Sequence, residues 1–163
     1  MKPSDRQELE RAVSTGAQLY KKSFRNIDLS KAKIRNARLP LCEFENVRFD
    51  FSDMTGVYAP GTMFKNCSFG DARLCEAYFR GAHFIDCQMR NSDFAGAVLS
   101  ETSFSDSDIK ASNFSFSDLT DAALRNVTVK GCRFFLADLI SVKPEFLAPL
   151  KTELKGAMLP AGV

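Results

Sequence analysis

The strongest constraint on this chain of 163 residues is a five-residue repeat that never changes register. Every fifth residue from Leu19 to Leu139 is large and apolar, with the single exception of Ala59. The series has 25 positions, of which 19 are Leu or Phe, and it holds eleven of the chain's 15 Phe residues. A period of five matches neither the 3.6 residues of an α-helical turn nor the two residues of a β-strand. The backbone must therefore turn a corner once in every repeat.

Two further positions of each repeat support this interpretation. The residue two before each centre is Ala, Ser, Thr, Cys or Val in 23 of 25 repeats, and Lys22 and Ile27 are the exceptions. The residue two after the centre is often Asn, Asp or Gly, which tolerate left-handed backbone. Four corners close a square, so one coil takes 20 residues, with the large and the small side chain pointing inward. This register stacks five rings roughly 4.8 Å apart, those of Phe24, Phe44, Phe64, Phe84 and Phe104.

This spacing resembles the pentapeptide-repeat family, whose pattern is A(D/N)LXX. The clearest local matches are Ser92-Asp93-Phe94, Ser112-Asn113-Phe114, Ser117-Asp118-Leu119 and Ala137-Asp138-Leu139. The resemblance covers residues 17–140 and implies an all-β fold, a right-handed quadrilateral β-helix. The hand of the coil comes from the resemblance and not from the period. With 20 residues in each coil, the solenoid has about six coils and rises roughly 30 Å.

Such a stack needs a cover at each end, because each coil buries its core only against its neighbours. Residues 1–16 are predicted to form an N-terminal cap, in which a capping box at Ser4-Asp5-Arg6-Gln7 starts a helix from about Asp5 to Thr15. Residues 17–140 form the solenoid, and residues 141–163 form an irregular C-terminal cap, where Pro144 and Pro149 interrupt the pattern. The whole chain is thus predicted to be one pentapeptide-repeat domain.

The residues indicate no catalytic, cofactor or metal chemistry, and we predict that the protein is not an enzyme. The single histidine, His83, precedes a repeat centre and is expected to face solvent. Cys75 points outward, whereas the other four cysteines take the small inward position, where they replace Ala; these are Cys42, Cys67, Cys87 and Cys132. The sequence has no C-x-x-C pair of the kind that holds zinc.

Charge and hydropathy restrict the partners and the compartment. The net charge is +2, although residues 1–40 carry +6 and residues 41–141 carry −5. The basic start could touch an acidic partner, but a solvated end of the solenoid is favoured, so direct binding to nucleic acid is not expected. No signal peptide and no apolar stretch of about 18 residues is visible, which indicates a cytoplasmic protein without membrane attachment.

An outward apolar ladder is the most pointed surface feature. Tyr58, Tyr78 and Val98 are spaced by 20 residues, and Pro40 and Pro60 lie on the same face at the other side of the centres. An exposed apolar ladder favours an interface with another protein. The alternative is cross-strand packing that only stabilises this face.

A second apolar group follows the repeats, in the segment that contains Phe146, Leu147 and Leu150. These side chains are expected to plug the last coil, to join two copies in a homodimer, or both.

The leading functional hypothesis is a non-catalytic scaffold for protein–protein interaction, because a rod with a filled core offers surfaces but no cleft. The resemblance implies an alternative, since some pentapeptide-repeat proteins are DNA mimics that bind type II topoisomerases such as gyrase and protect them from quinolones. The basic start argues against that reading, as does the unbroken register, which leaves no room for the loop insertions of such resistance proteins. A delivered effector or a toxin-associated protein is a third possibility, because such roles leave no mark on the repeat.

Overall fold

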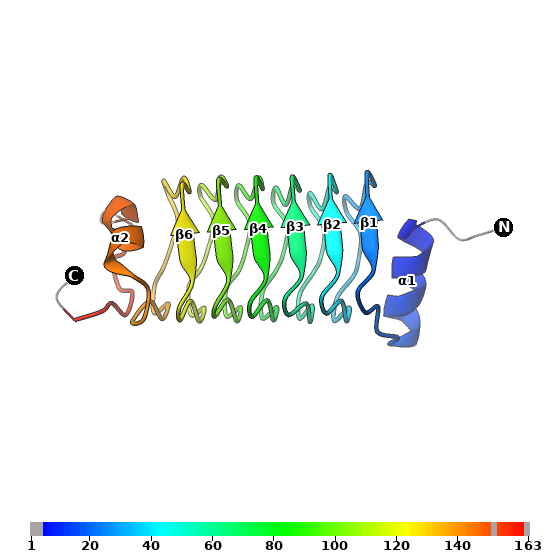
Figure 1. The fold of residues 1–163 in the computed structure, drawn as a ribbon, viewed down its shortest axis with the longest axis horizontal. Helices are drawn as coiled ribbons and strands as arrows, with labels where there is room; N and C mark the ends of the chain where they lie inside the picture. The colour runs from blue at the N-terminus through cyan, green and yellow to red at the C-terminus, as the bar shows by residue number, and fades with distance from the viewer. Residues whose placement is uncertain (1–4, 151–152, 162–163) are drawn as a thin grey trace.

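The computed structural model describes residues 5–150 and 153–161, apart from the side chain of Pro149. The elements lie in a row along a rod (Figure 1), with helix α1 (Asp5–Thr15) at one end. Helix α2 (Pro144–Leu147) and the short 3-10 helix η1 (Ala148–Leu150) follow the last strand at the other end. Ser4 of the predicted capping box lies outside the described residues.

Six three-residue strands form one parallel sheet in sequential order. They are β1 (Ser23–Arg25), β2 (Glu43–Glu45), β3 (Met63–Lys65), β4 (His83–Ile85), β5 (Ser103–Ser105) and β6 (Ala123–Arg125). Each residue of β1 to β5 pairs with the residue 20 positions later in the next strand, as Phe24 does with Phe44. Parallel bridges outside the sheet keep the same spacing of 20 residues. The chain therefore forms a parallel β-solenoid with one strand of the sheet in each coil, as the period predicts.

The corners of the coil lie two residues after each repeat centre. Every fifth residue from Lys21 to Leu136 has a positive φ, between 51° and 78°. On three sides of the coil, most corners close with a hydrogen bond from the next small residue, such as Ala32 N–H to Leu29 C=O at 3.0 Å. After each strand the corner is open, and at the first coils its Asn side chains pair from coil to coil, as Asn46 Nδ2 does with Asn26 Oδ1 at 2.9 Å.

The core contains all 25 repeat centres, each of which is buried. The rings of the predicted Phe column stack with centroids 4.9 to 5.2 Å apart and planes within 11° of parallel. Rings from neighbouring columns meet edge to face, as Phe64 and Phe69 do at 5.4 Å and 75°. Both arrangements are favourable for aromatic quadrupoles, so the columns lock together while each remains stacked.

The small inward residues supply hydrogen bonds as well as space. Their hydroxyls and thiols donate to the carbonyl of a repeat centre 23 residues earlier, as Thr62 Oγ1 does to Leu39 O at 2.6 Å and Ser92 Oγ does to Phe69 O at 2.7 Å. Most of these buried polar atoms are therefore satisfied, which removes the main cost of placing Ser or Thr in an apolar core; Ser52 Oγ is the exception among the small inward residues that the structure describes, since it is buried without a partner.

The Asp residues before the centres make local backbone hydrogen bonds. Asp118 Oδ1 accepts the N–H of Thr120 at 2.9 Å, and Asp138 Oδ1 accepts the N–H of Ile140 at 3.0 Å. This contact closes an Asx turn at the start of the corner and explains why Asp or Asn is preferred there.

Helix α1 caps the first coil. Its Leu9 is fully buried, and Glu8 Oε1 lies 3.1 Å from Lys22 Nζ. Lys22 occupies a small inward position of the repeat, but no earlier coil covers it, and its side chain remains exposed. The ion pair with the cap explains why a lysine is tolerated at this position.

The C-terminal segment caps the last coil, which corrects part of the self-association hypothesis. Leu147 and Leu150 are fully buried within the chain, so their side chains are not free to join two copies. Helix α2 places Leu147 and the 3-10 helix η1 places Leu150 on the core, because Pro144 starts α2 and ends the run of β-coils. Of the three predicted contact residues, only the half-buried Phe146 reaches the surface.

We expect Phe84→Ala to destabilise the protein by about 3–5 kcal/mol, the usual cost of truncating a buried Phe. The ring of Phe84 stacks on Phe64 and Phe104, so its loss leaves a cavity between two coils. Urea unfolding followed by circular dichroism measures the change. Phe116→Ala is the matched control, because that ring is 60% exposed, and it should cost less than about 0.5 kcal/mol. Similar losses for the two variants would contradict the assignment of inward and outward positions.

Candidate protein-binding surface

One outward column of side chains runs along a side of the solenoid next to the sheet. It contains Arg38, Tyr58, Tyr78, Val98 and Asp118, each bridged in parallel to the next. We call these five residues the aromatic column. The column is basic at its N-terminal end, apolar in the middle and acidic at its C-terminal end.

The side chains of the aromatic column contact one another in sequence. The Arg38 guanidinium lies 5.2 Å from the centre of the Tyr58 ring, a cation–π contact. The rings of Tyr58 and Tyr78 stack at 5.1 Å and 19°. Tyr58 is nevertheless 38% exposed, and Tyr78 and Val98 are half-buried. The column therefore stabilises its own face and still presents an ordered apolar strip to solvent.

The two prolines predicted for this face differ. Pro60 is half-buried, but Pro40 is buried and is therefore removed from the candidate surface. A proline ring is bonded back to its own nitrogen, so it stays close to the backbone and does not extend from the rod as Tyr does.

A fixed charge pair adjoins Tyr78. Arg80 donates from Nε and Nη2 to Glu101 Oε1, at 3.2 and 2.7 Å. Hydrogen bonds with the Glu101 and Tyr78 side chains raise the pKa of the Arg80 guanidinium above its ordinary value, so it remains charged. Charged groups at the rim of an apolar strip favour specificity more than affinity.

A second exposed apolar group was not predicted from the sequence. Phe116, Phe135 and Leu136 are 60%, 53% and 45% exposed, and the two rings meet edge to face at 5.7 Å. We call these residues the corner cluster. Phe116 and Leu136 occupy the left-handed corner position, where most repeats have Asn, Asp or Gly. A large apolar residue at that position is the signal that could have revealed the cluster.

The cysteines divide as predicted into four inward thiols and one outward thiol. The four at inward positions are buried. Cys75 is half-buried, and the pKa of its thiol is raised to about 11. Burial is the main cause, and the interaction with Asp93 is the second. Burial likewise raises the pKa of Cys132 to about 11. The Cys75 thiol is therefore mostly protonated at neutral pH, whereas the thiolate is the reactive form.

Other chemistry finds little support in the described part of the chain. Within residues 5–150 and 153–161, no three His, Cys, Asp or Glu side chains gather in a way that could hold a metal ion. His83 is exposed on β4, as predicted. No helix among the described residues is long and apolar enough to cross a membrane.

Family profiles match most of the repeats. Residues 23–58 match the profile described as pentapeptide repeats in 8 copies, and residues 61–134 match that of the pentapeptide repeat region. The chain belongs to the pentapeptide-repeat family. No curated protein matches the sequence of this pentapeptide-repeat protein.

Several solved structures are similar to this pentapeptide-repeat protein. A trypsin-treated variant of QnrB1, a plasmid-mediated fluoroquinolone resistance protein, is 17% identical, with a TM-score of 0.44 over 78% of this chain and 68% of that one. A pentapeptide repeat protein from the thylakoid lumen of Arabidopsis thaliana is 17% identical, with a TM-score of 0.38 over 83% and 75%. One from the cyanobacterium Cyanothece 51142 is 11% identical, with a TM-score of 0.34 over 77% and 92%.

We expect all five cysteines of the native protein to react slowly with a bulky aromatic disulfide reagent at pH 7. With a pKa of about 11, only about one Cys75 thiol in ten thousand is ionised at that pH. Absorbance of the released thiolate measures the rate, which should rise about tenfold for each pH unit above 7 while the fold persists. The unfolded protein is the control and should release five equivalents rapidly. Fast modification of native Cys75 at pH 7 would refute the assignment.

Proposed function

We propose that this pentapeptide-repeat protein is a non-catalytic scaffold that binds another protein through the aromatic column. The observation that carries the proposal is the ordered, partly exposed stack of Tyr58 and Tyr78 on a rod with a filled core. Tyr is frequent among the residues that dominate binding energy, because it buries a large area and loses little side-chain entropy.

The order of the side chains along the column also supports a protein partner. Arg38 is held against Tyr58, and Asp118 is held by the backbone of Thr120, so both charges keep fixed positions. A partner that covers the two Tyr rings would meet a positive group at one end and a negative group at the other. Prearranged side chains lower the entropy cost of association.

The distribution of ion pairs favours this scaffold over a DNA mimic. A mimic needs rows of unpaired carboxylates, like the phosphates of a duplex. Here carboxylates pair with arginines of the neighbouring coil, as Asp53 does with Arg35 at 3.1 Å and Asp108 does with Arg90 at 2.6 Å. The surface is therefore mixed in sign over these coils.

We expect the double variant Tyr58→Ser with Tyr78→Ser to bind a partner recovered from the native cell about a thousandfold more weakly, since truncating a hot-spot residue costs about 2 kcal/mol and each 1.4 kcal/mol is about tenfold in affinity. Calorimetry on the purified complex measures the change. The double variant Phe116→Ser with Phe135→Ser removes two aromatic rings that are more exposed than the two Tyr rings, and it should bind normally. Unfolding curves of both variants show whether the fold is kept. Wild-type affinity of the Tyr variant for every recovered partner would overturn the proposal.

In a gyrase supercoiling assay, we expect micromolar protein neither to inhibit the enzyme nor to protect it from a quinolone. The physical reason is the mixed sign of the surface, which does not reproduce the field of DNA. A DNA-mimic protein with known activity serves as the positive control. Protection that depends on protein concentration would favour the topoisomerase hypothesis over the scaffold.

A further inference from the structure

The last strand of the sheet, β6, has an open edge. In earlier coils, the amide that follows each strand donates to the next coil, as Asp86 does to Ser105 C=O at 3.0 Å and Asp106 does to Arg125 C=O at 2.9 Å. The corresponding amide of Asn126, and that of Leu124 within β6, have no hydrogen-bond acceptor among the described residues. Two backbone donors are therefore available along the β6 edge of the sheet.

The edge is open because the chain leaves the sheet where a seventh strand would form. The spacing of 20 residues would place Lys143, Pro144 and Glu145 on β6, but Pro144 begins helix α2 instead. On another side of the last coil the ladder resumes, with Leu136 N–H donating to Gly156 C=O at 2.7 Å. The coil is thus continued on that side, while β6 is left for α2 to cover.

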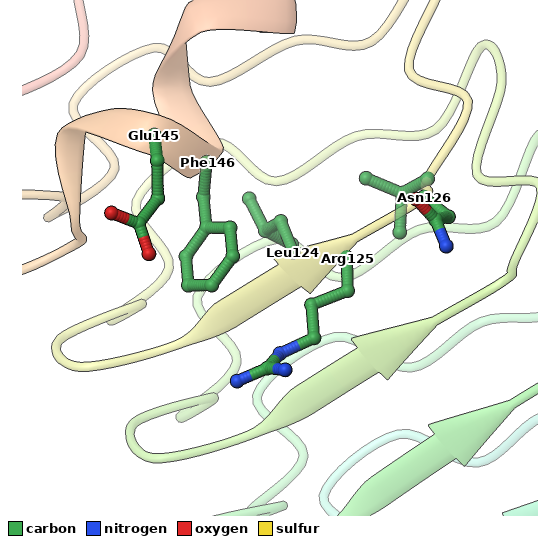
Figure 2. A pocket seen from close by; sticks show the side chains of 6 residues that line it. Leu124, Arg125, Asn126, Glu145 and Phe146 are labelled. Atoms are coloured by element: carbon green, nitrogen blue, oxygen red, sulfur yellow. The ribbon is translucent and has the colours of Figure 1, made fainter.

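Helix α2 does not fill the space over β6. A cavity of about 460 Å³ lies between them, lined by Leu124, Arg125, Asn126, Val127, Glu145 and Phe146. Figure 2 shows Phe146 and Glu145 projecting from α2 toward the strand. The Arg125 guanidinium lies 5.7 Å from the centre of the Phe146 ring. The cavity has an apolar floor and wall, with one basic and one acidic side chain on its rim.

We propose that this cavity binds an extended peptide from another protein, which adds to β6 as a seventh parallel strand. Strand addition of this kind takes its affinity from main-chain hydrogen bonds and its specificity from side-chain pockets. By repetition of the ladder, two peptide carbonyls would accept the amides of Leu124 and Asn126. The peptide residue between those carbonyls would stack on Leu124, beside Phe146, and must be apolar.

The charges on the rim indicate which residues flank that apolar side chain. The column that contains Arg125 alternates in charge over its first coils. Arg25 pairs with Glu45 of the next coil, and Glu45 pairs with Lys65 of the coil after that, both at 3.4 Å. By the same rule, the peptide residue above Arg125 is acidic. Glu145 lies toward the start of β6 in Figure 2, which favours a basic residue before the apolar one. The peptide therefore carries a basic, an apolar and an acidic residue, in that order.

Hydrogen exchange of the full chain is the first test. In the free protein, the amides of Leu124 and Asn126 should exchange at least tenfold faster than the equivalent amides of Phe104 and Asp106, which are paired. The end-capped peptide Thr-Thr-Lys-Phe-Glu-Thr-Thr should slow both open amides. Strong protection without peptide, or protection that rises with protein concentration, would overturn the proposal, because the edge would then be filled by this chain or by a second copy.

Peptide titration followed by NMR is the second test, and it separates strand addition from simple charge attraction. N-methylation of the Lys and Glu amides should weaken binding at least tenfold, and so should Arg125→Glu. Replacing only the Glu of the peptide by Lys should restore affinity for the Arg125→Glu variant, because the first Lys then keeps its place beside Glu145. Arg25→Glu is the matched control, five coils away in the same column, and should bind the original peptide normally. Absence of binding at millimolar peptide, or equal binding of the N-methylated peptide, would refute the proposal.

Discussion

The structure depends on a left-handed corner that recurs once in every five residues. Each corner turns the chain from one side of the square to the next, and four corners return it to its starting column after 20 residues. The left-handed conformation costs an ordinary L-residue roughly 1–2 kcal/mol of conformational free energy. Asn and Gly adopt it more readily, which explains why they are frequent at the corners. Phe51 and Phe116 nevertheless adopt it, with φ of 60° and 62°. The backbone ladders above and below each corner therefore impose the conformation even on unfavourable residues.

The same corners decide what the core can contain. Since only one large and one small side chain enter the square in each repeat, volume is conserved from coil to coil and the interior fills completely. Phe rings meet this requirement because they stack at a separation close to that of the strands. The buried hydroxyls and thiols fit because the carbonyl of a centre in the previous coil lies within reach. A core of this kind leaves binding to the outer faces and the ends.

The sequence predicted the parts of the structure that repeat. The centres, the Phe column and the helix over Asp5–Thr15 agree with the structure, because each follows from periodicity or from local capping signals. The predictions failed where a residue's position depends on contacts other than those between successive coils. Pro40 lies close to the backbone, and Leu147 and Leu150 turn inward over the last coil. The corner cluster was missed because its residues break the local preference at the corner.

Specificity on such a rod must come from departures from the repeat. A perfect solenoid presents the same polar groups on every coil, so a partner could bind in several registers with similar energy. Tyr58 and Tyr78 interrupt one column over two coils only, and a ligand that covers both rings has a single register. Pro144 has a comparable effect at the end of the sheet, because it stops the strand series and leaves one edge without a partner. The regular residues supply rigidity, and the exceptions determine where a partner can bind.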